Sequence, residues 1–329
     1  MPAERLAAVR CCVGLFALWY FARRITLYSD VARGHLTHFD PVGLAGFLTA
    51  PIPPFIVDLL FAVMLLLIVC FIVGWKYRFT APLLALLSLF LISYRNSWSM
   101  IYHTDNAMWL QLFILSMAPA GDRVSWDSWR RARRHQLVSN DQSPRNATHV
   151  NIQLSSVGND EERYGWPLRL MALATGITYF LAGIAKVASE SGWGWVLGEP
   201  MRMQVAVDGL RKDLFGSQAP ELAFFLYEHV WLFTLAGIGT LIFELGAPLF
   251  VINRSIGRLW AVATYGMHVG IWVVMGITFE YCLSGVIFAF LFDLEKPAYT
   301  IRGWLRRSRI VFVSSSGHPS RNMSADDSL

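Results

Sequence analysis

Long apolar segments alternate with short polar segments along most of the 329-residue chain. A helix needs about 20 apolar residues to cross the hydrocarbon layer of a bilayer, and several segments reach that length. The pattern predicts helices with the approximate bounds 6–28, 55–75, 79–94, 105–118, 166–187, 230–252, 259–278 and 281–292. The predicted fold class is therefore all-α: a polytopic transmembrane bundle of about eight helices.

The polar segments divide this bundle. The prolines of the PIPP motif, Pro51–Pro54, suit a helix start, where the missing N–H costs little. Residues 121–164 carry an arginine cluster and then a Ser/Asn/Asp-rich run, which predicts a partly disordered cytoplasmic loop. An amphipathic piece is predicted up to about Leu214. Residues 1–294 form the predicted membrane domain, and residues 295–329 are basic and then Ser-rich, which predicts a disordered tail.

Composition supports a membrane protein. Hydrophobic residues make up 55% of the chain and charged residues 16%, with a mean hydropathy of +0.43, whereas soluble domains carry about 25% charged residues. The net charge is +5, but the basic residues lie between apolar segments. They indicate membrane topology and a lipid bilayer partner, not nucleic acid. The four cysteines lie in apolar segments without metal-ligand spacing, so neither a disulfide framework nor a metal site is predicted.

The distribution of arginines predicts the orientation of the bundle. Eight spans that begin inside place most arginines in the cytoplasm, including Arg10, the cluster at 130–134 and the tail. Arg23, Arg24 and Arg95 are exceptions to this rule. Both termini are therefore predicted to be cytoplasmic. The first apolar block is read as an uncleaved helix and not as a signal peptide, because it lacks a small-x-small cleavage site.

Lys186 closes the predicted helix 166–187 in the sequence YFLAGIAKV, on the same helical face as Tyr179 and Gly183. The small residues Ala182 and Gly183 allow a neighbouring helix to approach closely. A desolvated lysine there would be a usable base. The alternative is a lysine that snorkels to the membrane interface.

Four further ionisable residues are candidates, because ionisable side chains in hydrocarbon are costly. Glu244 and His268 lie on adjacent predicted helices, where they would either relay protons or form one interhelical hydrogen bond. His103 and Asp105 lie at the predicted outer membrane edge. There Asp105 would equally serve as a helix N-cap, and His103 would equally be a solvated loop residue.

Two tryptophans complete the set of candidate residues. Trp193 and Trp195 form a Gly/Trp-rich stretch that is either an interfacial anchor or the floor of a pocket for a lipid-like ring. The chain contains no P-loop, dinucleotide fingerprint, HExxH motif or nucleophile elbow.

Three segments together resemble a known family. They are YHTDNAMWLQLFILSMAPAGDRVSWDSW, YFLAGIAKVASESGWGWVLGEPM and FELGAPLFVINRSIGRLWAVATYGMHVGI. Their order and spacing are similar to the horizontally transferred transmembrane (HTTM) domain, the membrane half of vitamin K-dependent gamma-carboxylases. The resemblance covers about residues 5 to 294, and YFLAGIAKV is its most specific part.

The resemblance implies roles for several residues. Lys186 matches the family lysine regarded as the base that deprotonates vitamin K hydroquinone, so a quinone or hydroquinone of the menaquinone or vitamin K type is the implied cofactor. Glu244 and His268 stand where the family has an acid and a histidine, and a family histidine falls near His103. The animal carboxylase has a large extramembrane domain after its helices, whereas here only residues 295–329 follow. Carboxylation of a protein substrate is therefore not expected.

Two functional hypotheses follow. The first is an enzyme of a bacterial cell membrane in which Lys186 is the base acting on a quinol-type or other lipid-soluble substrate, with Glu244 and His268 orienting it. The second is a non-catalytic membrane protein: a partner in maturation of a secreted peptide, an immunity factor or a passage for a small solute. In that case the same residues would serve packing and capping.

Overall fold

The computed structural model describes residues 2–34, 39–98, 103–141 and 156–296, without the side chains of residues 103, 135–141 and 156–160. Within these ranges every regular element is a helix, which confirms the all-α class. The chain forms two compact units, Met1–Phe292 and Asp293–Leu329. In the second unit the Lys296 ammonium lies 2.9 Å from the Asp293 carboxylate. The predicted disordered tail, from residue 297 onward, lies outside the described residues.

Four helices of the first unit are long and apolar enough to cross a membrane. They are α1 (Pro2–Ala22), α3 (Pro54–Val73), α4 (Tyr77–Asn96) and α7 (Ser156–Val187), in which the apolar part is Glu161–Val187. The mean hydropathy of α3 reaches 3.2, and large apolar side chains on it such as Phe55, Leu59 and Leu66 are exposed. An exposed apolar surface of this extent suits contact with lipid chains. The length and composition of these four helices are consistent with an integral membrane protein.

The remaining apolar helices differ from their predicted bounds. They are α5 (His103–Met117), α10 (Val230–Leu245) and α11 (Arg254–Met275). The predicted helix 230–252 is wrong at its end, because α10 stops before Pro248 and the 3-10 helix η4 (Ala247–Val251) follows. The predicted helix 281–292 is also wrong. Its residues form α12 (Glu280–Leu283) and the 3-10 helix η5 (Val286–Leu291), separated by Gly285 at φ 72°.

Several polar segments are helical. A separate helix, α2 (Ile25–Ala32), follows α1, so the predicted single helix to residue 28 is wrong. The predicted loop 121–164 contains α6 (Trp126–Asp141) and the first turns of α7, while residues 142–155 lie outside the described residues. The amphipathic helix α8 (Glu199–Leu214) ends where it was predicted to end. Short elements complete the unit: η2 (Gly43–Ala45), η3 (Gly192–Leu197) and α9 (Glu221–Leu226).

A tight turn between α3 and α4 also fixes the start of α6. Gly74 has φ 70°, and a Cβ atom at this position would lie 2.4 Å from the Cβ of Ser125. The Asp127 carboxylate accepts hydrogen bonds from the backbone N–H groups of Lys76 at 3.0 Å and Tyr77 at 2.9 Å. These bonds cap the first turn of α4 from outside the helix. The base of α6 is therefore held at the end of two membrane-crossing helices.

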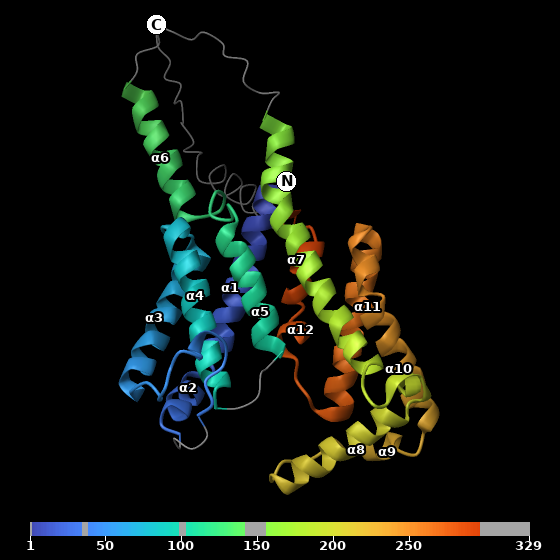
Figure 1. Cartoon of the computed structure of the whole chain (residues 1–329). Helices are drawn as coiled ribbons and strands as arrows, with labels where there is room; N and C mark the ends of the chain where they lie inside the picture. Colours follow the sequence, from blue (N-terminus) through green and yellow to red (C-terminus); the bar gives the residue numbers. More distant parts are fainter. Residues whose placement is uncertain (1, 35–38, 99–102, 142–155, 297–329) are drawn as a thin grey trace, which may run out of the picture. The chain divides into compact units, whose positions relative to one another are not determined.

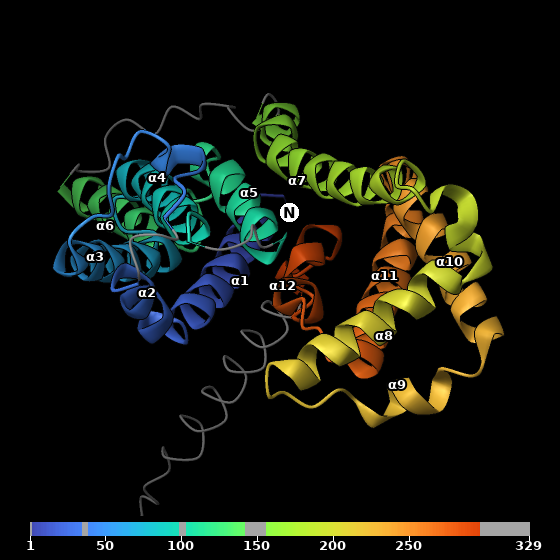
Figure 2. The same cartoon turned by 60° about the horizontal axis from the view of Figure 1, so that its bottom comes forward.

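Figure 1 shows the chain reversing direction between successive long helices of the first unit. Helix α1 packs against α3, α5, α7 and η5, and α4 packs between α3 and α5. Helices α7, α10 and η3 form a second set of contacts, and η4 links α7 to α11. Figure 2 shows α8 lying across α10 and α11, both of which it contacts. The elements that carry the candidate residues are thus packed around α7.

Arg10 is fully buried within the bundle, although the sequence predicted a cytoplasmic topology charge. Its guanidinium donates to the carbonyl oxygens of Ala120 at 2.7 Å, Val124 at 2.5 Å and Ile72 at 3.2 Å. The Ile72 carbonyl lies at the C-terminal end of α3, where the helix dipole is negative and the backbone lacks intrahelical donors. Ala120 and Val124 lie in the segment between α5 and α6. Arg10 therefore connects three segments at one end of the bundle.

The three arginines that break the positive-inside pattern all pair with carboxylates. Arg24 lies 2.7 Å and Arg23 lies 3.7 Å from Glu280. Arg95 lies 2.6 Å from Asp105, and both side chains are buried. Arg23 and Arg24 thus share one carboxylate from another element, and the buried Arg95 has a carboxylate of its own, which explains how these charges are tolerated.

Candidate functional site

The centre of the candidate site is an ion pair between α7 and α10. The Nζ atom of Lys186 lies 2.7 Å from both carboxylate oxygens of Glu244. The Glu244 side chain is 7% exposed, whereas that of Lys186 is 24% exposed. The Lys186 side chain is therefore partly accessible, while the Glu244 side chain is enclosed.

Glycine at position 183 makes this pairing possible. A Cβ atom there would lie 3.0 Å from the Cβ of Glu244 and 2.9 Å from the side chain of Leu245. Such contacts are tighter than side chains usually make, so the absence of a side chain at Gly183 favours the close approach of α7 and α10. Gly183 lies one helical turn before Lys186 and on the same side of α7. The predicted close approach of a neighbouring helix at this point is present.

Lys186 lies in the last turn of α7, and Glu244 lies in the last turn of α10. Beyond α7, η3 lies along α10, and the hydroxyl of Thr234 donates to the carbonyl of Leu197 at 2.9 Å. Glu244 follows Thr234 by ten residues, which corresponds to about 15 Å along a helix. The Lys186 ammonium is held at the level of Glu244 by this ion pair.

The two tryptophans after α7 have different surroundings. Trp195 is 6% exposed, and its ring centroid lies 5.7 Å from Lys186 Nζ. Its indole N–H has no hydrogen-bond partner among the described residues. Trp193 is 64% exposed. The predicted anchoring surface therefore fits Trp193, while Trp195 forms one wall beside the ion pair and offers an unused donor.

A second group of side chains extends from Tyr179 on α7. Its ring meets the rings of Trp260 and His268 edge to face, with centroid distances of 5.0 and 5.8 Å. The Tyr179 hydroxyl lies 3.5 Å from the Cys282 sulfur. His268 Nδ1 lies 2.8 Å from the carbonyl oxygen of Thr264. Because a carbonyl only accepts, Nδ1 must carry the proton, which leaves Nε2 as an acceptor.

The candidate residues thus fall into separate groups. Glu244 pairs with Lys186, and among the described residues it makes no hydrogen bond to His268. The predicted Glu244–His268 pair is therefore wrong, because the two side chains bind different partners. The side chain of His103 lies outside the described residues. Helix α7 and its neighbours carry five of the candidate residues: Lys186, Glu244, Trp195, Tyr179 and His268.

Asp105 belongs to a different cluster between α1, α4 and α5. Its carboxylate accepts a hydrogen bond from the Tyr20 hydroxyl at 2.5 Å and lies 2.6 Å from Arg95. The predicted N-cap role is wrong, since the helix begins at His103 and the carboxylate binds these two side chains instead. The Arg24 guanidinium lies over the Tyr20 ring at 3.7 Å. Sequence reasoning missed Tyr20, because nothing in an apolar helix marks which tyrosine meets a distant acid.

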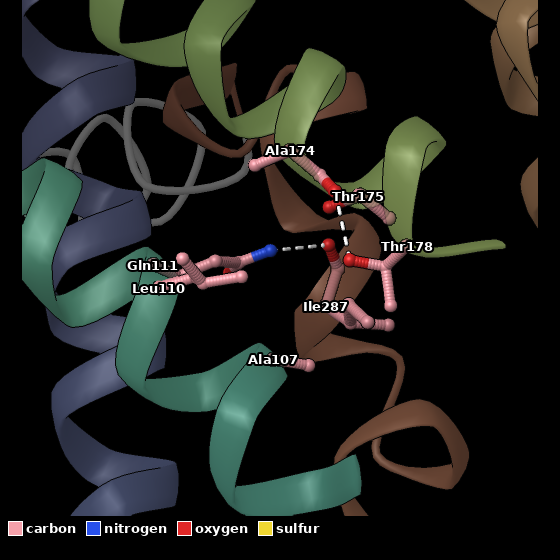
Figure 3. Close-up of a pocket in the computed structure, with 7 residues that line it drawn as sticks. All are labelled: Ala107, Leu110, Gln111, Ala174, Thr175, Thr178 and Ile287. Carbon is pink, nitrogen blue, oxygen red and sulfur yellow. Dashed lines mark hydrogen bonds between the residues drawn. The ribbon is translucent and has the colours of Figure 1, made fainter. Parts of the chain in front are cut away.

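A small cavity lies between α5, α7 and η5 (Figure 3). The Gln111 amide donates to the Ile287 carbonyl at 2.9 Å beside it, and the Thr178 hydroxyl donates to the Ala174 carbonyl at 2.9 Å. Its lining residues are Ala107, Leu110, Gln111, Ala174, Thr175, Thr178 and Ile287. Its volume of about 10 Å³ is enough for about one water molecule. It is too small to hold an aromatic ring.

The described side chains include no group of three or more His, Cys, Asp or Glu residues arranged to hold a metal ion. The Lys186–Glu244 pair itself offers groups that can transfer a proton. An ammonium and a carboxylate at 2.7 Å can share one proton, so the pair offers a base, an acid and a fixed positive charge.

Comparisons of the chain with protein-family models, with curated proteins and with solved structures found no match. The arrangement around Lys186 and Glu244 is consequently the basis for the function proposed next.

Proposed function

We propose that this protein is an integral membrane enzyme, related to the HTTM domain of gamma-carboxylase-like proteins, that deprotonates a lipid-soluble quinol-type substrate. The observation that carries the proposal is the Lys186–Glu244 pair inside the bundle, with both carboxylate oxygens 2.7 Å from Nζ. Ionisable residues at membrane depth are costly and are functional candidates by default.

The proposed topology has eight spans with both termini in the cytoplasm of a bacterial cell. The spans are α1, α3, α4, α5, α7, α10, α11 and the segment formed by α12 and η5. Two observations support it: successive long helices run in opposite directions in Figure 1, and each arginine that violates the positive-inside pattern is paired with a carboxylate.

The chemistry needs one proton shift before substrate is deprotonated. In the resting pair Lys186 is an ammonium and Glu244 a carboxylate. Transfer of a proton from Nζ to Glu244 yields a neutral amine and a neutral carboxylic acid without separating charge. The amine then accepts the proton of the substrate hydroxyl, and the resulting ammonium stabilises the substrate anion beside it.

A quinol, when bound, would supply the acidic hydroxyl group. The residues fit such a substrate in two respects: the Lys186 side chain is 24% exposed, and the Trp195 ring lies 5.7 Å from its Nζ atom. Because the cavity of Figure 3 is too small for a ring, the substrate is proposed to enter from the lipid. The exposed rings and chains of Trp193 and Leu197 offer an apolar path.

Tyr179 and His268 are proposed as positioning residues for α7. They hold the helix face that carries Lys186 through contacts to α11 and α12. His103 and Asp105 lie elsewhere in the chain. The proposal gives Asp105 the role of holding α5 to α1 and α4, and a secreted peptide is a second candidate partner at the outer surface.

A non-catalytic membrane protein is the second candidate, and one observation favours it. Both carboxylate oxygens of Glu244 are already engaged by Lys186, so the pair would also serve simply to fix α7 against α10. In that case Lys186→Arg, which keeps the charge, would retain all properties of the protein.

Quinone binding by the purified protein separates the two candidates. Quenching of tryptophan fluorescence by a menaquinone analogue would be compared among wild type, Lys186→Arg and Lys186→Ala, each first shown to be folded. We expect saturable binding, and deprotonation of the bound hydroquinone that Lys186→Ala abolishes. Absence of saturable binding, or equal deprotonation in wild type and Lys186→Ala, would leave the non-catalytic role as the better account.

A further inference from the structure

Helix α6 carries an exposed surface of unusual composition at the end of the bundle. Trp126 and Trp129 are 47% and 50% exposed, and their ring centroids lie 4.9 Å apart. Arg130, Arg133 and Arg134 follow on the next turn and are exposed. We refer to these five residues as the α6 patch.

Helical spacing places the patch on one side of α6. Trp126 and Arg130 are four residues apart, as are Trp129 and Arg133, so each arginine lies one turn beyond a tryptophan. The Arg133 guanidinium lies over the Trp129 ring, 5.3 Å from its centroid. The remaining arginine, Arg131, points elsewhere and lies 3.6 Å from the Asp122 carboxylate. The patch therefore presents aromatic rings first and positive charge about 6 Å further along the helix.

The acidic residues near the patch are committed to other groups. Asp127 accepts from the backbone of the α3–α4 turn, and Asp122 pairs with Arg131 and with Arg163, the latter at 2.7 Å. Within the described ranges no carboxylate lies within ion-pairing distance of the patch arginines. The α6 patch thus has an excess of positive charge that an external anion would neutralise.

The position of α6 identifies the anion. Its base is hydrogen-bonded to the α3–α4 turn, and Figure 1 shows α6 extending beyond the ends of these two helices. Val73 on α3, Trp75 in the α3–α4 turn and Phe79 on α4 are exposed, Phe79 to 75%. The exposed apolar residues, the tryptophans and the arginines follow one another along α3, α4 and α6. A phospholipid presents its acyl chains, its interfacial region and its phosphate in the same order.

We propose that the α6 patch binds the anionic headgroup of a phospholipid, with the lipid chains lying against the exposed ends of α3 and α4. A soluble anion would use the arginines but would leave the apolar wall uncovered, so one lipid molecule accounts for both features. Under the topology proposed above, the bound lipid belongs to the cytoplasmic leaflet. The preference for an anionic headgroup does not depend on that topology.

The test compares two lipids that differ only in headgroup charge. Phosphatidylglycerol and phosphatidylcholine, each labelled on one acyl chain, would be titrated with the full-length protein in dodecyl maltoside micelles and followed by fluorescence anisotropy. We expect wild type to bind phosphatidylglycerol more tightly, and added salt to reduce that preference because the sites are exposed. Equal binding of the two lipids by wild type would overturn the proposal.

A matched pair of double variants locates the site. Arg130→Gln/Arg133→Gln removes two patch charges, while Arg131→Gln/Arg163→Gln removes two exposed charges that pair with Asp122. Each arginine near a membrane surface contributes about a fivefold change in affinity for anionic lipid. The first variant should therefore weaken phosphatidylglycerol binding by about 25-fold and leave phosphatidylcholine binding unchanged. The proposal fails if the second variant loses as much affinity as the first.

Discussion

The Lys186–Glu244 pair predicts a specific pattern of stability in a double-mutant cycle. Lys186→Met removes the cation that pairs with the Glu244 carboxylate, whose side chain is 7% exposed. Removing one partner of a buried ion pair costs about 3–5 kcal/mol, because the other charge is left uncompensated. Glu244→Gln should cost less, toward the lower end of this range, since the Lys186 side chain is 24% exposed and can reorient.

The double variant Lys186→Met/Glu244→Gln leaves no buried charge at the position of this ion pair. It should be more stable than Lys186→Met alone, and the two single effects should overlap by about 2–3 kcal/mol. The measurement is equilibrium unfolding in mixed micelles, titrated with dodecyl sulfate and followed by circular dichroism. If the single effects add to within about 0.5 kcal/mol, the two residues are not coupled and the reasoning is refuted.

Three further predictions concern residues outside this pair. Arg10→Met should destabilise the protein by about 3 kcal/mol or more, because buried carbonyl oxygens lose their donor; the exposed Arg123→Met is the control in the same unfolding assay. Gly183→Ala should lower the melting temperature and weaken quinone binding, because the added Cβ pushes α7 away from α10. The control Gly266→Ala, at a position with open space around it, should be neutral or stabilising. Asp105→Asn should cost about 3–5 kcal/mol by removing the carboxylate charge that pairs with the buried Arg95; an unfolding midpoint equal to that of wild type would contradict this.

The parts of the fold that the sequence predicted are those decided by local pattern. The apolar length of α3 and the prolines before it locate a membrane helix, and the amphipathic spacing of α8 locates its end at Leu214. Helix ends set by single residues were harder to predict. The stop of α10 depends on Pro248, and the break before η5 depends on Gly285, both within continuous apolar runs.

The candidate site could be predicted only in part. Lys186 and the close approach at Gly183 are visible in YFLAGIAKV, but its partner Glu244 is 58 residues away and on another helix. Periodicity shows which face a residue occupies and not which helix that face meets. The same limitation hid the environment of Arg10, whose partners lie more than 60 residues further along the chain.

Helix α6 shows a different limit. Its sequence is polar enough to resemble a solvated loop, and its start is fixed by Asp127 binding the backbone of a turn about 50 residues earlier. Such a long-range cap has no local signature. The arginine cluster was noted from sequence, but its alignment with Trp126 and Trp129 on one side of a helix required the structure.

The ionisation state of a bound hydroquinone tests the central claim most directly. A reduced menaquinone analogue would be added anaerobically to the protein in lipid nanodiscs at neutral pH, and its absorbance spectrum recorded, because the hydroquinone anion absorbs at longer wavelength than the neutral form. The account predicts that wild type shifts the spectrum toward the anion and that Lys186→Ala, folded and still containing Glu244, does not. An anion signal of equal size in Lys186→Ala, or no signal with saturated wild type, would contradict the assignment of Lys186 as the base.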